Sequence, residues 1–137
     1  MPTLSKTSLD RLSTCHQDLI IFCTELIKHY DFVVVCGHRG EAEQNEAYFK
    51  GNSKLKFPNS KHNTYPSKAV DLAPWEGKID WDKNQMFYFA GFAKGVAAML
   101  YKNGVIKHEI RSGIDWDDDT DVNDTSFLDA PHFEIID

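Results

Sequence analysis

Short strand-like runs that alternate irregularly with longer helical segments are the feature that most restricts the fold of this chain. Residues 32–36 and 69–74 are rich in β-branched or alternating apolar residues, and each run stops at a glycine or a proline. Helical patterns lie around them without the regular repetition that builds a parallel sheet. Because 137 residues supply one hydrophobic core, we expect a single α+β domain in which a small antiparallel sheet packs against helices.

The helical segments differ in how clearly their ends are marked. Apolar residues recur at steps of three and four over residues 9–30, which predicts one long amphipathic helix. Residues 41–50 are rich in helix formers and precede a glycine, whereas residues 82–103 begin at a capping aspartate and also end before a glycine. Weaker patterns predict two further strands, over residues 105–110 and 133–136.

The connections also carry information. Residues 52–68 are rich in Ser, Asn and Pro and follow neither the helical nor the strand period. A stretch of this kind inside a small domain indicates a functional loop. Residues 75–81 contain Gly77 between two tryptophans and are expected to form a hairpin turn.

Charge and cysteine content narrow the possible functions. The net charge is −6, so the surface lacks the clustered cations of a nucleic-acid-binding protein. The chain has neither an apolar run long enough to span a membrane nor a secretory signal in its first ten residues, so we expect a cytoplasmic protein without stable membrane association. Cys15, Cys23 and Cys36 form no paired motif and are expected to be small core residues.

Three residues are candidates for a catalytic metal site, which needs three protein ligands and one open position. His62 lies in the structureless loop, and Asp71 follows nine residues later on a predicted strand. His132 begins the last predicted strand, and Asp129 stands three residues before it. Each residue alone is more typical of a turn or a cap, so the interpretation depends on the motifs around them.

These motifs are Ser60-Lys61-His62, then Ala69-Val70-Asp71, and finally DAPHFE at residues 129–134. Together they resemble the M15 family of zinc peptidases, and most closely its L-alanyl-D-glutamate endopeptidases of phages and bacteria. The resemblance runs from about residue 35 to residue 136 and implies the fold shared by hedgehog and D-Ala-D-Ala peptidases. One departure is the interval between His62 and Asp71, which is nine residues instead of the familiar seven and lacks a glycine. A loop tolerates such an insertion without moving its ends far.

The resemblance implies a role for each matching position. It implies one zinc ion per chain, bound by His62, Asp71 and His132. Asp129 matches the catalytic carboxylate that moves a proton, and Arg39 matches an arginine that stabilises the oxyanion. The positions that match polar residues near the substrate or the metal loop are Ser60, Gln44 and Ser53.

The acidic stretch at residues 115–124 leaves two interpretations open. Its carboxylates alternate, as oxygen ligands of calcium often do, which allows a second cation at this loop. It lacks the glycine and the terminal glutamate of an EF-hand, and runs of charge normally face water. A solvated acidic loop is therefore the favoured interpretation.

The function implied by the resemblance is hydrolysis of the L-Ala–D-Glu bond in peptidoglycan stem peptides. We expect a monomeric phage endolysin without a separate wall-binding domain, which waits in the host cytoplasm until a holin-like factor opens the membrane and host lysis follows. A second interpretation is a D,D-carboxypeptidase or dipeptidase of cell-wall peptides. A third is an inactive, metal-stabilised module that binds the cell wall.

Overall fold

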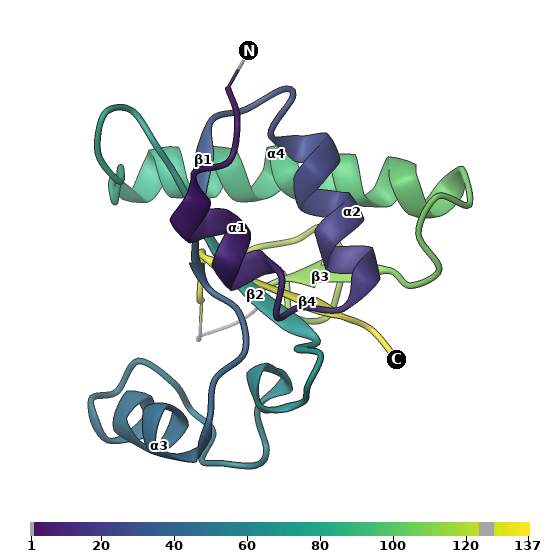
Figure 1. Cartoon of the computed structure of the whole chain (residues 1–137). Helices are drawn as coiled ribbons and strands as arrows, with labels where there is room; N and C mark the ends of the chain where they lie inside the picture. Colours follow the sequence, from purple (N-terminus) through teal and green to yellow (C-terminus); the bar gives the residue numbers. More distant parts are fainter. Residues whose placement is uncertain (1, 124–127) are drawn as a thin grey trace.

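The strands form one antiparallel sheet. The computed structural model describes residues 2–123 and 128–137, and within them the strand order is β1-β2-β4-β3, with every neighbouring pair antiparallel. Figure 1 shows this sheet beside the helices, which confirms the expected α+β class. The strands span Phe32–Cys36 (β1), Ala69–Pro74 (β2), Ile110–Ser112 (β3) and His132–Ile135 (β4).

The core lies between the sheet and two of the helices. Phe133 of β4 packs against Phe22 of α2 and Phe89 of α4, with ring centroids 5.6 and 6.4 Å away. All three side chains are fully buried, and aromatic rings contribute large buried apolar areas. The helices span Lys6–Leu12 (α1), Gln17–Leu26 (α2), Glu41–Phe49 (α3) and Lys83–Lys102 (α4), and a short 3-10 turn, η1, spans Lys61–Asn63.

The expected helix over residues 9–30 is wrong, because the structure has two helices there. The hydroxyls of Ser13 and Thr14 donate to carbonyls three residues earlier, which competes with helix continuation. His16 then caps α2 by accepting a hydrogen bond from the backbone of Asp18. Its own backbone N–H donates to Ser67 across the fold. The break therefore depends on a long-range contact that the helical period does not contain.

The strand expected at residues 105–110 is also displaced, since β3 begins only at Ile110. The backbone N–H groups of Lys107 and His108 donate to Oδ2 of Asp18, each at 3.0 Å. The His108 ring donates to the same oxygen through Nδ1 at 2.8 Å. This buried carboxylate thus holds the chain between α4 and β3 in a turn, and these residues do not extend the strand.

Asp18→Asn is expected to lower the free energy of unfolding at pH 7 by about 1–3 kcal/mol, because hydrogen bonds to a buried charged group are lost or weakened. Burial opposes ionisation, but the hydrogen bonds from His108 and the backbone lower the pKa of Asp18. Because the pKa of Asp18 is lower in the folded state than in the unfolded state, the ionised carboxylate stabilises the fold at pH values above the unfolded-state pKa. This contribution is lost as the pH falls through the folded-state pKa.

Urea unfolding at pH 7 and in acid measures this effect, which we expect to be smaller in acid. Asp10→Asn is the matched control, because Asp10 forms an exposed i,i+4 pair with Lys6, and such pairs contribute about 0–1 kcal/mol. Equal losses for the two variants would contradict a structural role for Asp18.

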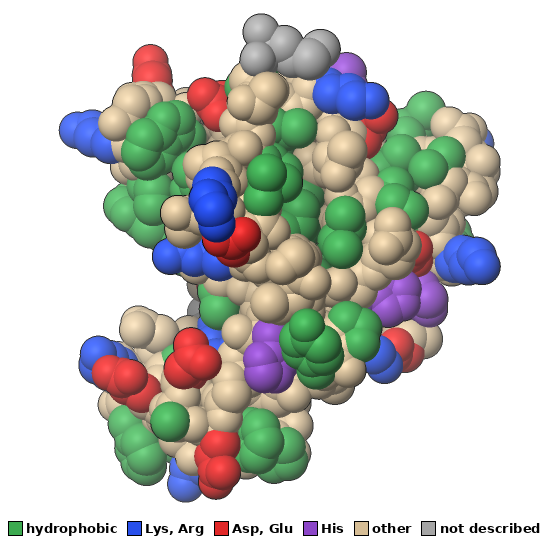
Figure 2. All heavy atoms as spheres, viewed as in Figure 1, with side chains coloured by type: hydrophobic (Ala, Val, Ile, Leu, Met, Phe, Trp, Pro, Cys, Tyr) green, Lys and Arg blue, Asp and Glu red, His purple; other side chains and the backbone are tan. Residues whose placement is uncertain are grey.

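Residues 39–63, here called the α3 arm, stand apart from the other helices, as Figures 1 and 2 show. Gln44 is the one residue of α3 that is buried. Phe49 at the end of the helix is 76% exposed. The arm is therefore held by polar contacts near Arg39 and Gln44 more than by an apolar interface.

The remaining predicted helices and strands agree with the structure. The strand at residues 69–74 and the helix at residues 41–50 are present within one residue of their expected limits. α4 is capped by Asp82, whose side chain accepts from the backbone of Gln85. Trp75 and Ile79 form an antiparallel bridge around Gly77, which confirms the turn.

Candidate active site

Asp71 lies in the middle of a row of side chains that crosses three strands. Cys36 of β1 and His132 of β4 stand opposite Asp71 on its two sides. Directly paired residues on antiparallel strands point to the same face, with their β-carbons about 4.5–5.5 Å apart. The register of the sheet thus gathers Cys36, Asp71 and His132 on one face.

His62 reaches the same place from the loop before β2. Ser60 caps the turn η1 by accepting from the backbone of His62 at 3.2 Å. The backbone N–H of Arg39 donates to the His62 carbonyl at 2.8 Å, which ties this turn to the end of β1. The His62 side chain is 2% exposed, so its ring is held in place by the residues packed around it.

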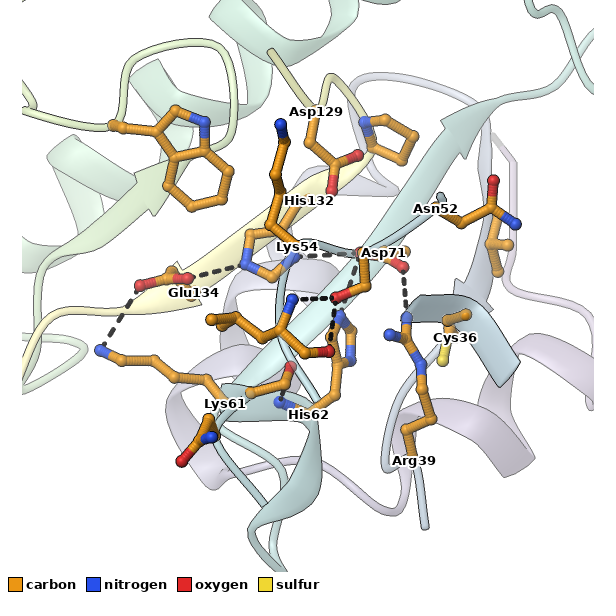
Figure 3. Close-up of a pocket in the computed structure, with 18 of the residues that line it drawn as sticks. Cys36, Arg39, Asn52, Lys54, Lys61, His62, Asp71, Asp129, His132 and Glu134 are labelled. Atoms are coloured by element: carbon orange, nitrogen blue, oxygen red, sulfur yellow. Dashed lines mark hydrogen bonds and ion pairs between the residues drawn. The ribbon is translucent and has the colours of Figure 1, made fainter. Parts of the chain in front are cut away.

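The two imidazoles converge on one oxygen of Asp71 (Figure 3). Nε2 of His62 lies 3.2 Å from Oδ1 of Asp71, and Nδ1 of His132 lies 3.3 Å from the same atom. Two ligands that are each about 2.0–2.1 Å from a tetrahedral ion lie roughly 3.3 Å apart. The measured separations therefore fit a shared metal ion.

The outward-facing ring nitrogens also have partners of the kind that metal-binding histidines use. Nδ1 of His62 faces the carbonyl of Gly37 at 2.7 Å, and Nε2 of His132 faces Oε1 of Glu134 at 2.8 Å. Each of these nitrogens carries a proton, so the other nitrogen of each ring, which faces Asp71, is the one available to a metal ion. Despite burial, His132 and Arg111 lower the pKa of Glu134 to about 2.

The charges of this site favour a cation. Burial disfavours the charged imidazolium, yet the Asp71 carboxylate raises the pKa of His62 to about 10. Hydrogen bonds to Asp71 and Glu134 likewise outweigh burial and raise the pKa of His132. In turn, the two rings overcome burial and hold the pKa of Asp71 well below its usual range. A bound metal ion would replace the protons on these rings.

Asp129 lies next to this set in the loop before β4. Its backbone is fixed at Gly113, whose carbonyl accepts from the N–H of Asp129 at 2.8 Å. A β-carbon at Gly113 would collide with the Asp129 carbonyl, so the close approach needs glycine. Burial and the charge of Asp71 raise the pKa of Asp129. A carboxylate with a raised pKa beside a donor set is suited to proton transfer.

Arg39 approaches the set from the opposite side. Its guanidinium donates to Oδ2 of Asp71 at 3.3 Å and to Oε1 of Gln44 at 3.0 Å. Gln44 donates in turn to Ser53 Oγ at 2.9 Å and to the carbonyl of Leu55. Because Gln44 is fully buried, this structure gives its side chain a role in holding Arg39 and the loop and leaves it no surface for a substrate.

The donor set, Asp129 and Arg39 face a cleft of about 590 Å³ between the α3 arm and the sheet. Such a volume is in the range of sites that hold small ligands. Of the sequence candidates, Arg39, Ser53, Ser60, His62, Asp71, Asp129 and His132 line this cleft.

Several residues that line the cleft were not among the candidates from the sequence. Glu134 stands two residues after His132, and strand periodicity puts both on one face, which is a signal that could have found it. Cys36 was expected in the core, whereas it is only partly buried and lines the cleft; Cys15 and Cys23 are buried as expected. Trp81 and Trp116 also line the cleft, and the Trp116 ring lies 5.2 Å from the ring of His132; neither was a candidate site residue.

The acidic loop is stabilised by contacts of its own. Asp115 accepts hydrogen bonds from the backbone of Asp119 and Thr120. Lys94 pairs with Asp118 at 2.5 Å and approaches Asp115 at 3.8 Å. Carboxylate oxygens of Asp115, Asp117 and Asp119 lie within 4.8 Å of one another. This spacing is compatible with a second cation at the loop, which stays a prediction. Asp124, the last residue of the expected stretch, lies outside the described residues.

A comparison with known protein families shows that this chain is a peptidase. The model of the phage L-alanyl-D-glutamate peptidase family matches residues 2–136, and the chain belongs to this family. The crystal structure of the Serratia marcescens L-Ala D-Glu endopeptidase ChiX has a similar fold. The two share 20% sequence identity, with a TM-score of 0.73 over 98% of this chain and 90% of that chain. No curated protein sequence matches the chain.

Within residues 2–123 and 128–137, none of the helices has the length and hydropathy needed to cross a membrane.

Proposed function

We propose that this peptidase is a zinc-dependent endopeptidase that hydrolyses the L-Ala–D-Glu bond of peptidoglycan stem peptides. The observation that carries the proposal is the convergence of His62 Nε2 and His132 Nδ1 on one oxygen of Asp71. Two histidines and a carboxylate form a set that catalytic zinc sites use, with one position left open. The family match supports the assignment of the L-Ala–D-Glu bond as the bond that is cleaved.

The chemistry follows from the groups around the cleft. When bound, zinc polarises the scissile carbonyl and lowers the pKa of water from about 15.7 to about 7. Asp129 takes a proton from the attacking water and delivers it to the nitrogen of D-Glu as the peptide bond breaks. Arg39 provides fixed positive charge near the carbonyl oxygen, where negative charge develops, while its contact with Asp71 keeps that ligand in place.

We further propose a biological role as a phage endolysin. A single peptidase domain acts as a monomer on the cell wall of the host, and its activity causes host lysis. The name of the matching family, which refers to phages, supports this role. Access to the wall from the host cytoplasm then depends on a holin-like factor.

Mass spectrometry of digested peptidoglycan tests the reaction. Purified muropeptides are incubated with zinc-loaded protein and with protein that has been treated with a chelator. We expect new peptides with an N-terminal D-Glu from the zinc-loaded sample and none from the chelated one, with recovery after zinc is added back.

The same experiment separates the other interpretations. Release of free D-Ala without an N-terminal D-Glu would assign a D,D-carboxypeptidase instead. Unchanged cleavage after complete removal of the metal would contradict the metal-dependent mechanism. If the zinc-loaded protein binds peptidoglycan but yields no product, a wall-binding module replaces the endopeptidase.

Glu134→Gln is expected to weaken zinc binding by about 10- to 100-fold, because carboxylates that orient a metal-binding histidine have effects of this size. The variant loses the charge that faces Nε2 of His132. Competition with a chromophoric chelator measures the affinity. Glu109→Gln, at an exposed carboxylate next to β3, is the control that should bind zinc as the native chain does. Equal affinities for the native chain and Glu134→Gln would contradict the role of Glu134.

A further inference from the structure

Cys36 occupies the outer position of the row that contains Asp71 and His132. It pairs directly with Asp71 in the sheet, and the register shifts between Val34 and Cys36. Such an irregularity re-aims the side chains at the end of a strand. The Cys36 side chain lines the cleft (Figure 3), whereas Cys15 and Cys23 are buried in the core.

The position of the thiol relative to two of the expected zinc ligands is the central observation. One ligand atom each from Cys36, His62 and Asp71 forms a set whose members all lie within 4.8 Å of one another. A rotation about the Cα–Cβ bond moves a thiol sulfur by roughly 2–3 Å between staggered positions. A Zn–S bond is about 2.3 Å long, so a rotamer change of this size is comparable to the adjustment that coordination by Sγ requires.

We propose that the Cys36 thiolate is a fourth protein donor to the metal ion held by His62, Asp71 and His132. This inference rests on the proposed metal site and adds a residue to it. A set of four protein donors closes the coordination sphere, whereas catalysis needs an open position. Cys36 coordination therefore defines a resting form, and the active form has Cys36 released.

The soft donor has a further consequence for the choice of metal. Thiolate ligands favour thiophilic ions such as zinc, whereas sites of oxygen and nitrogen alone accept harder ions more readily. Cys36→Ser is expected to lower zinc affinity by at least about tenfold, since the loss of an outer partner alone costs about 10- to 100-fold. The same substitution should change the affinity for manganese much less.

Cobalt substitution gives a direct readout of the sulfur. Cobalt(II) bound at the site produces visible d–d bands, and a coordinated thiolate adds a charge-transfer band in the near ultraviolet. We expect both in the native chain. Cys36→Ser should keep the d–d bands and lose the charge-transfer band, and Cys15→Ala, which removes a buried thiol outside the site, should keep both.

The outcomes distinguish this inference from the proposed function. Visible bands in the native chain without a charge-transfer band would overturn Cys36 coordination and leave the three-ligand site intact. Failure of the native, folded chain to bind cobalt or zinc would overturn the metal-dependent function, and with it this inference.

Thiol protection is an independent measurement. Iodoacetamide alkylates a free thiolate, whose sulfur forms a bond to carbon as iodide leaves. In the folded, metal-free protein we expect modification at Cys36, the partly exposed cysteine. Zinc should slow this reaction by at least about tenfold, in line with the expected affinity change. An alkylation rate that zinc leaves unchanged would overturn the proposal.

Discussion

Asp129→Asn is expected to lower kcat for cleavage of muropeptides by about 10²- to 10⁴-fold, the usual contribution of a carboxylate that transfers protons in the transition state. Asparagine keeps the shape of the side chain but cannot take a proton from water. The backbone contact with Gly113 does not depend on the carboxylate, so the loop should keep its conformation. Zinc content should also remain unchanged, because Asp129 is not among the proposed ligands.

Steady-state kinetics on a defined muropeptide, with zinc content measured in the same samples, tests this expectation. Asp31→Asn is the matched control, because Asp31 is exposed and immediately precedes Phe32, which pairs with Pro74 at the end of β1 away from Cys36. The control should retain native kcat. A kcat for Asp129→Asn within about threefold of the native value would remove Asp129 from the proton transfer, since even the lower limit of such effects is about 10²-fold.

Asp71→Ala should have the second large effect, namely loss of zinc binding together with loss of activity. Oδ1 of Asp71 is the atom on which both histidines converge, and Oδ2 accepts from Arg39. Lewis-acid stabilisation by a catalytic metal is worth several kcal/mol, which corresponds to a decrease in kcat on the order of 10³-fold or more. Removing one partner of a buried charge network also costs about 3–5 kcal/mol of stability.

A comparison with chelation separates the two parts of this effect. The chelated native chain should lose activity and regain it on addition of zinc, whereas Asp71→Ala should stay inactive at any zinc concentration that the native chain tolerates. Thermal unfolding with and without zinc should show a metal-dependent shift only for the native chain. A variant that binds zinc with native affinity would show that Asp71 is not a ligand.

The predictions from sequence succeeded where local signals determine structure. Glycine and proline mark the ends of β1 and β2, and Asp82 marks the start of α4. They failed where a residue far away in the sequence determines the backbone conformation. His16 donates its backbone N–H to Ser67, and Lys107 donates its backbone N–H to Asp18. A periodic pattern contains no information about such long-range partners.

The same distinction applies to the site. The motifs around His62, Asp71 and His132 indicated the donor set, and the structure brings these side chains together. Cys36 was missed because its place in the site depends on strand pairing, whereas the two-residue period of the last strand could have placed Glu134 on the face of His132. The register that places Cys36 opposite Asp71 includes an irregularity, and a shift of one residue reverses the face of a side chain.

The two walls of the cleft differ in how firmly the protein holds them. Asp71 belongs to β2, which is paired on both sides within the sheet, so this wall opens only when the core itself unfolds. On the other wall, α3 buries one residue, Gln44, and segments with few buried apolar contacts open at low free-energy cost. Movement of α3 can therefore widen the entrance for a polymeric substrate, while the buried His62 and the sheet residues Asp71 and His132 stay in place.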